Sequence, residues 1–173
     1  MQQTLKKLSP PSWSLHDITA TDTEFVRLLY RSTREAELSS LPWTEAQKIA
    51  FCEMQQRAQT MGYAATYPQA EYRLIRVGAQ AAGRLINAWT DQGLVLVDIA
   101  LLPTFWGCGL GTMLLTSLQQ EAAAQDKALL LSVDKLNRAM KLYSRLGFSI
   151  VGEHDLRIQM AWKRVVRGKI VAA

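Results

Sequence analysis

The sequence predicts an α+β fold with helices in its first seventy residues and strands in most of the remainder. Two segments, 21–36 and 44–60, carry apolar side chains at the three- and four-residue spacing of an amphipathic helix. Beyond residue 70, short alternating or apolar runs are separated by turn residues, as in strands. A strand, a glycine-rich turn and a further helical pattern then follow one another between residues 94 and 122. Together these observations predict a sheet flanked by helices.

Length and composition predict a single globular domain over residues 1–173, with residues 1–12 as a loose lead-in. Hydrophobic residues make up 49% and charged residues 20%, which is ordinary for a folded domain. No apolar run approaches membrane-spanning length, and two cysteines do not make a disulfide framework. We therefore expect a cytoplasmic protein without membrane contact. Two histidines and two separated cysteines show no metal-ligand spacing, so no metal site is expected.

The net charge of +5 favours an acidic ligand. Lysine and arginine are scattered, with small clusters only at 6–7 and 163–169, and no nucleic-acid-binding motif is present. We therefore expect no nucleic acid partner, and a solvated surface accounts for the two clusters.

The helical half begins with a short strand at 13–18, in which side chains alternate. Thr21 or Asp22 is expected to cap the first helix. Its expected apolar face comprises Phe25, Leu28, Leu29, Ser32 and Ala36. Thr44 and Gln47 form a capping box for a second helix that runs to about residue 60. The apolar residues expected on that helix are Ile49, Cys52, Met54 and Met61.

The strand-rich half begins at Glu71, and segments 72–77 and 82–89 predict a hairpin. Residues 94–102 form a nine-residue central strand, which Pro103 ends because proline cannot donate to a ladder. The remaining expected strands are 127–133, which has no polar face, and the paired segments 148–151 and 156–161.

The glycine-rich turn 103–112 connects the central strand to a helix that begins within the glycines. Glycines allow several backbone N–H groups to converge, and a helix N-terminus adds partial positive charge. These features predict a phosphate site. No lysine precedes Thr112, which excludes a Walker loop, and the third glycine of a dinucleotide fingerprint is absent. A plain tight turn remains the alternative at this point.

A second motif lies downstream at 137–148. Taken with Gly109 and Gly111, it resembles the GNAT superfamily of N-acetyltransferases. Members have a Q/R-x-x-G-x-G/A turn after a strand and then an N-x-x-A-x-x-x-Y-x-x-x-G-F helix. The residues that match the second pattern in type and order are Asn137, Tyr143, Gly147 and Phe148, with Ala139 one place early. Trp106 occupies the Q/R position, which departs from the pattern.

The resemblance covers residues 71–163 and implies a mixed, mostly antiparallel twisted sheet that splays at its central strands. It also implies acetyl-CoA as cosubstrate, with its pyrophosphate on backbone N–H groups of the turn and its pantetheine arm on main-chain groups of the central strand. One such N–H would polarise the acetyl carbonyl. The cofactor-binding residues that follow from this are Leu101, Leu102, Gly107, Cys108, Gly109, Leu110, Gly111, Thr112 and Asn137. Asn137 is also a natural helix N-cap. Cys108 is expected to be a loop side chain and not an acyl carrier.

By resemblance, Tyr143 donates a proton to the departing thiolate, although its helical apolar stripe also fits a core tyrosine. Asp98 is the other catalytic candidate, because a carboxylate inside an apolar strand needs a partner or a function. An Asp that holds an arginine in place is an equal alternative. Ser132 stands where some relatives carry a glutamate base, and Glu35 and Glu37 are further candidates. The identity of the base stays open.

The predicted function is acetyl transfer from acetyl-CoA to a primary amine, by direct attack in a ternary complex. A catalytically silent acyl-CoA-binding or regulatory module is one alternative, and a nucleotide-binding protein unrelated to acyl transfer is another. The acceptor is expected to be a small-molecule or peptide amine that binds against residues 31–68. A homodimer stays open, with Trp43 or Trp89 as expected exposed residues.

Overall fold

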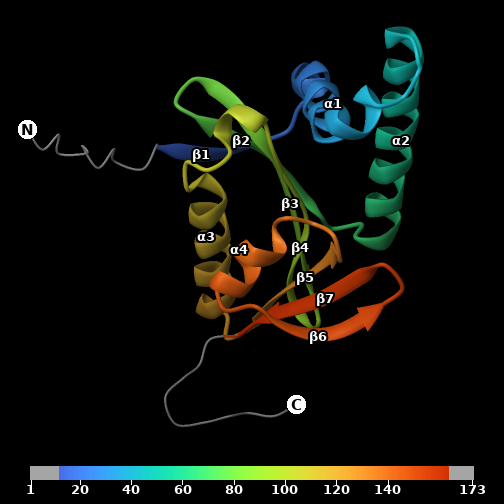
Figure 1. Cartoon of the computed structure of the whole chain (residues 1–173). Coiled ribbons are helices and arrows are strands. Elements are labelled where there is room, and N and C mark those ends of the chain that lie inside the picture. Colours follow the sequence, from blue (N-terminus) through green and yellow to red (C-terminus); the bar gives the residue numbers. More distant parts are fainter. Residues whose placement is uncertain (1–11, 164–173) are drawn as a thin grey trace, which may run out of the picture.

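The computed structural model describes residues 12–163 and contains one seven-stranded sheet with four α-helices (Figure 1). The lead-in expected at residues 1–12 and the basic cluster at 163–169 lie almost wholly outside these residues. The strands are β1 Trp13–Asp17, β2 Glu71–Val77, β3 Gln80–Thr90, β4 Gly93–Leu101, β5 Ala128–Asp134, β6 Ser149–His154 and β7 Arg157–Trp162. The helices are α1 Thr23–Ser39, α2 Glu45–Thr66, α3 Leu110–Ala124 and α4 Met140–Arg145. The expected α+β class is confirmed.

The strand order is β1-β2-β3-β4-β5-β7-β6, and β4 with β5 is the parallel pair in an otherwise antiparallel sheet. These two strands pair only where Gly93–Leu96 faces Ala128–Leu131. β4 continues to Leu101 and β5 to Asp134, so the ends of both strands extend beyond their shared ladder. The expected splay between the central strands is therefore present.

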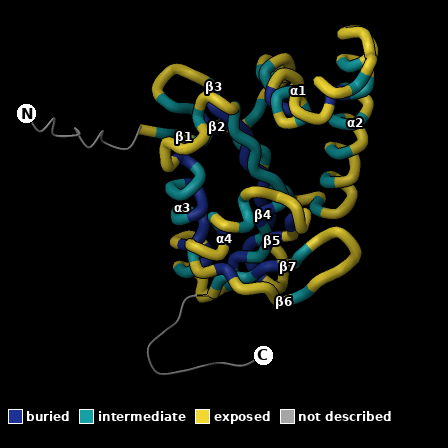
Figure 2. Tube along the Cα trace, in the orientation of Figure 1, coloured by how far each residue is buried: buried dark blue, intermediate teal, exposed yellow. Residues whose placement is uncertain are grey.

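Helices cover the two faces of the sheet differently (Figure 1). On one face, α3 packs on β4 and β5 over the main core, with α4 beside it. On the other face, α1 contacts β3 and β4, while α2 packs chiefly against α1. In Figure 2, α3 includes buried residues in dark blue, whereas most residues of α2 are exposed or intermediate.

α1 buries only part of the face that was expected to meet the core. A 3₁₀ turn at Ala20–Asp22, capped by Thr19, precedes the helix, which begins at Thr23. Val26, Leu29, Tyr30 and Leu38 are buried, whereas Leu28 is 56% exposed and Ala36 is exposed. The helix has two overlapping apolar stripes, and the approach of the sheet and α2 decided which one is covered.

α2 has the expected capping box, since the Thr44 side chain accepts from the Gln47 N–H and the Gln47 side chain accepts from the Thr44 N–H. The helix continues to Thr66, past the expected end. Cys52 is buried, but Ile49, Met54 and Met61 are exposed. Only one edge of α2 reaches α1, and this leaves most of its apolar residues on the surface.

The strand expectations are confirmed, including the β2–β3 hairpin and the antiparallel β6–β7 pair. An irregularity in the β3–β4 register leaves Val97 as an extra residue, because Asp98 faces Ile86 while Leu96 faces Asn87. A bulge of this kind reverses which side chains point to each face. Leu94, Leu96, Ile99 and Leu101 therefore all contribute to the core under α3, and Asp98 points to the face of α1.

Among the described residues, no helix has the length and apolar character that crossing a membrane requires.

Candidate active site

The turn before α3 has the backbone geometry of an anion site. Gly107 and Gly109 have φ of +75° and +86°, which glycine adopts without strain. Gly109 is the N-cap residue, has no side chain to cap the helix, and its carbonyl accepts the first helical bond from Met113 at 3.0 Å. The N–H groups of the first turn, those of Leu110, Gly111 and Thr112, are therefore open to a ligand. A Cβ built at Gly107 or Gly109 meets no atom within 4 Å, so the loop faces open space.

The surroundings of this helix terminus favour negative charge. The first turn of α3 contains no acidic residue. Arg145 of α4 reaches Thr112, with its Nη2 3.5 Å from the Thr112 Oγ1, and a Cβ at Gly111 would lie 3.4 Å from Leu142. α4 therefore brings the basic side chain of Arg145 close to the helix N-terminus. The site fits a phosphate-bearing group.

The end of β4 offers main-chain groups on the side of the splay. Leu102 donates its N–H to Ala82 of β3 at 2.9 Å and accepts at its carbonyl from Phe105, also at 2.9 Å. No free main-chain group is therefore left at Leu102, contrary to expectation. Because alternate residues of a strand point their N–H and C=O to opposite sides, those of Leu101 and Ile99 point away from β3. These are the groups that an added strand can reach.

Trp106 lies against this strand end. Its indole Nε1 donates a hydrogen bond to the Leu101 carbonyl oxygen at 2.8 Å. The guanidinium carbon of Arg138 lies 3.5 Å from the centre of the indole ring. The residue that departs from the family pattern is thus in contact with the strand and with the segment after β5.

Tyr143 of α4 is 5% exposed and packs edge-to-face on Phe148, with 5.6 Å between ring centroids. Burial, together with the negative charge of Asp98, raises the pKa of its phenol to about 12. Tyr72 Oη is the buried side-chain polar atom without a hydrogen-bond partner in residues 12–163. The Tyr143 hydroxyl likewise makes no side-chain hydrogen bond to another described residue. Both expectations for this residue, core packing and an available hydroxyl, are compatible with its position.

Asp98 forms an ion pair with Arg84 of β3. Arg84 Nη2 and Nε lie 2.7 and 3.0 Å from Asp98 Oδ2, and Arg84 also donates to Gln59 of α2 at 3.0 Å. Arg84 is 5% exposed and the Asp98 side chain 18% exposed. Asp98 therefore holds an arginine through Oδ2, as in the alternative expected for it. Its Oδ1 has no partner among the described residues.

The sequence did not single out Tyr63 of α2. Burial first and the Asp98 carboxylate second raise the pKa of its phenol to about 12, against the opposing effect of Arg84 and Arg157. The same carboxylate therefore acts on a tyrosine from each side of the sheet, Tyr63 and Tyr143. Tyr63 lies on α2 beyond the expected end of that helix at about residue 60, and the fold brings it toward β4.

Two further site residues differ in detail from expectation. Asn137 is not the N-cap of α4, which begins at Met140 after Ala139; its Oδ1 instead accepts from the Ala139 N–H at 2.8 Å and holds the preceding turn. Cys108 is exposed and its thiol donates to the Phe105 carbonyl at 3.0 Å. The C-terminus of α4 is as expected, because Gly147 has φ of +84° and the Phe148 N–H bonds the Tyr143 carbonyl at 3.1 Å.

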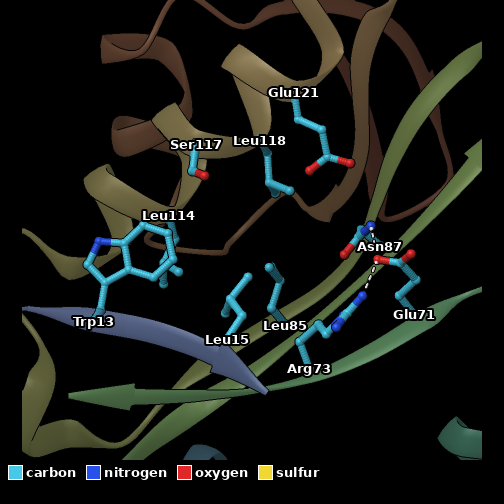
Figure 3. Close-up of a pocket in the computed structure, with 10 residues that line it drawn as sticks. All are labelled: Trp13, Leu15, Glu71, Arg73, Leu85, Asn87, Leu114, Ser117, Leu118 and Glu121. Carbon is cyan, nitrogen blue, oxygen red and sulfur yellow. Dashed lines mark hydrogen bonds and ion pairs between the residues drawn. The ribbon is translucent and has the colours of Figure 1, made fainter. Parts of the chain in front are cut away.

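A separate pocket of about 380 Å³ lies between α3 and strands β1 to β3 (Figure 3). Two of its charged groups are paired, since Glu71 accepts from Arg73 at 3.1 Å and Arg73 also contacts Asp17 at 2.8 Å, while Glu121 has no ion pair among the described residues. Neither the glycine turn nor Tyr143 lines it. We assign this pocket no part in the reaction.

The splayed strands, the open helix N-terminus and the tyrosine after β5 define a protein that can hold a phosphate-bearing ligand along β4. Residues 23–148 match the acetyltransferase (GNAT) family. Because this match covers most of the chain, the protein belongs to the GNAT acetyltransferase family, as the motifs indicated. Members of this family use acetyl-CoA as cosubstrate. No curated protein matches the sequence.

Solved structures share the fold. The chain is similar to a PaiA N-acetyltransferase from Thermoplasma acidophilum in complex with coenzyme A, with a TM-score of 0.67 and 12% identity over 88% of this chain and 99% of the other. An acetyltransferase from Thermus thermophilus gives a TM-score of 0.63 and 18% identity over 90% and 99%. The ribosomal-protein-S18-alanine N-acetyltransferase from Escherichia coli gives a TM-score of 0.56 and 20% identity over 94% and 100%. At these identities the likeness concerns the fold.

Proposed function

We propose that this protein transfers the acetyl group of acetyl-CoA to a primary amine, by direct attack in a ternary complex. The observation that carries the proposal is the open N-terminus of α3 at the end of a splayed β4. Three N–H groups without a hydrogen-bond partner among the described residues, together with Arg145 of α4, favour a diphosphate there. The main-chain groups of Ile99 and Leu101 that point away from β3 then extend along the path that an acyl-bearing arm would take.

When bound, acetyl-CoA supplies a thioester, so that the N–C bond to the acceptor forms as the C–S bond breaks, the amine loses a proton and the sulfur gains one. The chain's own groups would assist at both ends. The Ile99 N–H points into the splay and is placed to stabilise negative charge on a carbonyl oxygen. The Tyr143 phenol, which is protonated at neutral pH because burial raises its pKa to about 12, donates a hydrogen bond to the sulfur side.

Asp98 is the group we propose to take the proton from the amine, directly or by way of a water molecule, through Oδ1, which has no partner in residues 12–163. The bulge at Val97 turns this side chain to the face of α1 and α2, where the acceptor is proposed to bind. Arg84 holds the carboxylate through Oδ2 and fixes its orientation. Glu35 and Glu37 of α1 lie on the surface and Glu37 is paired with Arg34, so they are less suited to this role.

The proposed acceptor is a small-molecule or peptide amine that enters between α2 and the sheet, where Gln59 and Tyr63 face the Arg84–Asp98 pair. We propose a cytoplasmic location, since both cysteines are unpaired thiols. Trp43 is exposed and suits a homodimer contact, whereas Trp89 packs against the core and does not.

The test combines ligand binding with turnover. Coenzyme A at 100 times its dissociation constant should stabilise the fold by about 2.7 kcal/mol and raise Tm by about 5–10 °C. NAD and ATP at the same concentration should have smaller effects. A panel of polyamines, amino acid amides and short peptides, followed by thiol release and product mass, should then reveal an acetylated amine. Binding without turnover of any amine would favour the silent acyl-CoA-binding module, and preferential stabilisation by NAD or ATP would contradict the proposal.

The role of Asp98 can be separated from its bond to Arg84. Asp98→Asn should destabilise the fold by about 3 kcal/mol in urea unfolding, because a buried guanidinium loses its charged partner. The double variant Asp98→Asn with Arg84→Met removes both charges and should recover much of that stability. If Asp98 is the base, both variants acetylate amines about 100-fold more slowly than wild type. Recovery of activity in the stable double variant would show that Asp98 serves only to hold Arg84.

A further inference from the structure

Trp106 makes two contacts that lie across the open end of the splay. The first is the hydrogen bond from its indole Nε1 to the Leu101 carbonyl, at 2.8 Å. The second is the stack of its ring against the Arg138 guanidinium, at 3.5 Å. Trp106 follows β4, whereas Arg138 follows β5. The pair therefore joins the two arms of the splay.

The Leu101 carbonyl is the acceptor that a ligand lying along β4 needs. It points away from β3, because its neighbour Leu102 donates to Ala82 on that side. The indole approaches this oxygen from the direction in which an added strand would approach. A carbonyl has a second lone pair, but an arm that pairs with β4 has to share this oxygen with the indole that is already bonded to it.

We infer that the Trp106 side chain is an internal competitor of the acyl-CoA arm: its indole occupies the Leu101 carbonyl and must leave before the arm pairs with β4. Trp106 would thereby set the affinity for the cosubstrate. This inference rests on the proposed function and adds to it, because the family pattern places glutamine or arginine where this chain has tryptophan. We call the arrangement with the indole on the Leu101 carbonyl closed. The apparent affinity for the ligand is the intrinsic affinity multiplied by the fraction of molecules in which the indole has left this carbonyl.

The hydrogen bond to Leu101 and the stack on Arg138 explain why the indole lies on the carbonyl in the free protein. The Trp106 side chain is 42% exposed, so few other contacts hold it in place. The indole N–H has a carbonyl partner, and the planar guanidinium stacks on the ring face with the geometry of a cation–π pair. Each contact contributes only modest free energy, because its groups can bond to water instead. The indole can therefore stay on Leu101 in the free protein and still be displaced by a ligand.

Trp106→Phe is the discriminating variant, since phenylalanine keeps a ring against Arg138 but has no N–H for Leu101. We expect the dissociation constant for coenzyme A, measured by calorimetry on the full chain, to fall by about 3- to 10-fold, as for the loss of one competing hydrogen bond. Trp43→Phe is the matched control, because Trp43 is 37% exposed in the α1–α2 connection, and it should leave the dissociation constant unchanged. Far-ultraviolet circular dichroism and Tm establish that both variants are folded.

A second readout concerns the indole itself. Coenzyme A should change the acrylamide quenching of tryptophan emission in the wild-type protein, and this change should be absent in Trp106→Phe. Equal or weaker binding of coenzyme A by folded Trp106→Phe overturns the inference while the proposed function stands. If neither protein binds coenzyme A, both the inference and the proposed function fail. Binding by Trp106→Phe with none by the wild type would support the competitor role in its strongest form.

Discussion

Tyr143→Phe is expected to acetylate amines about 100-fold more slowly than the wild-type protein, the lower end of the range for loss of a general acid. Its affinity for coenzyme A should change little, because the phenyl ring keeps its edge-to-face contact with Phe148. The hydroxyl is the only group removed, and it makes no side-chain hydrogen bond in residues 12–163 that the fold would lose. The measurement is kcat with a saturating amine, alongside calorimetric binding of coenzyme A.

The pH dependence provides an independent check on Tyr143. Burial first and the Asp98 charge second raise its pKa to about 12, so the donating phenol persists as pH rises. The rate should therefore not decline between pH 8 and 10 through ionisation of this group. A decline there that disappears in Tyr143→Phe would contradict the raised pKa of this phenol, although it would support a part for Tyr143 in the reaction. Tyr72→Phe is the control, because the buried Tyr72 hydroxyl has no partner and its removal should leave kcat unchanged.

Gly109→Val is expected to weaken coenzyme A binding by about 100-fold or more. A β-branched residue at φ of +86° carries strain of about 1–3 kcal/mol, which the loop relieves by leaving the left-handed region. That movement displaces the first N–H groups of α3, and each hydrogen bond from them to a charged ligand contributes about 1.5–3 kcal/mol. The new side chain also projects into the open space where the ligand is proposed to lie.

Asp126→Val is the matched control for Gly109→Val. Asp126 has φ of +53° and follows the other end of α3, a helix of 15 residues whose length is about 22 Å. The variant introduces the same side chain at a left-handed position without approaching the glycine turn. It should lower stability by about 1–2 kcal/mol and leave coenzyme A affinity unchanged. Equal loss of binding in both variants would mean that general destabilisation, and not the turn, explains the effect of Gly109→Val.

Local sequence patterns predicted the elements of this fold well where the signal was local. The Thr44–Gln47 capping box and the Gly147 helix stop each depend on a few neighbouring residues, and both formed as expected. The prediction of which α1 side chains are buried was partly wrong, because Val26 and Leu28 are similarly apolar and only packing decides which of them is covered. Met54 and Met61 of α2 are exposed for the same reason. The spacing of apolar residues does not show that this helix packs against α1 along one edge only.

The site divides in a similar way. The glycine turn before α3 could be predicted from the sequence, because the positive φ of Gly107 and Gly109 and a helix start without a capping side chain require little more than glycine. Asp98 was notable in the sequence as an isolated carboxylate, but its partner Arg84 lies 14 positions earlier in the chain, and a register irregularity at Val97 brought them together. Tyr63 carried no sequence signal at all.

The sequence by itself determined the order of strands and helices, the open helix N-terminus and the family. Each of these follows from backbone preferences of short segments and from two motifs in order. Only the tertiary structure decided that the Leu102 main chain is occupied, that Asp98 is paired with Arg84 and that Trp106 covers the Leu101 carbonyl. These are contacts between groups whose neighbours depend on register, strand splay and chain reversal, and no local pattern specifies them.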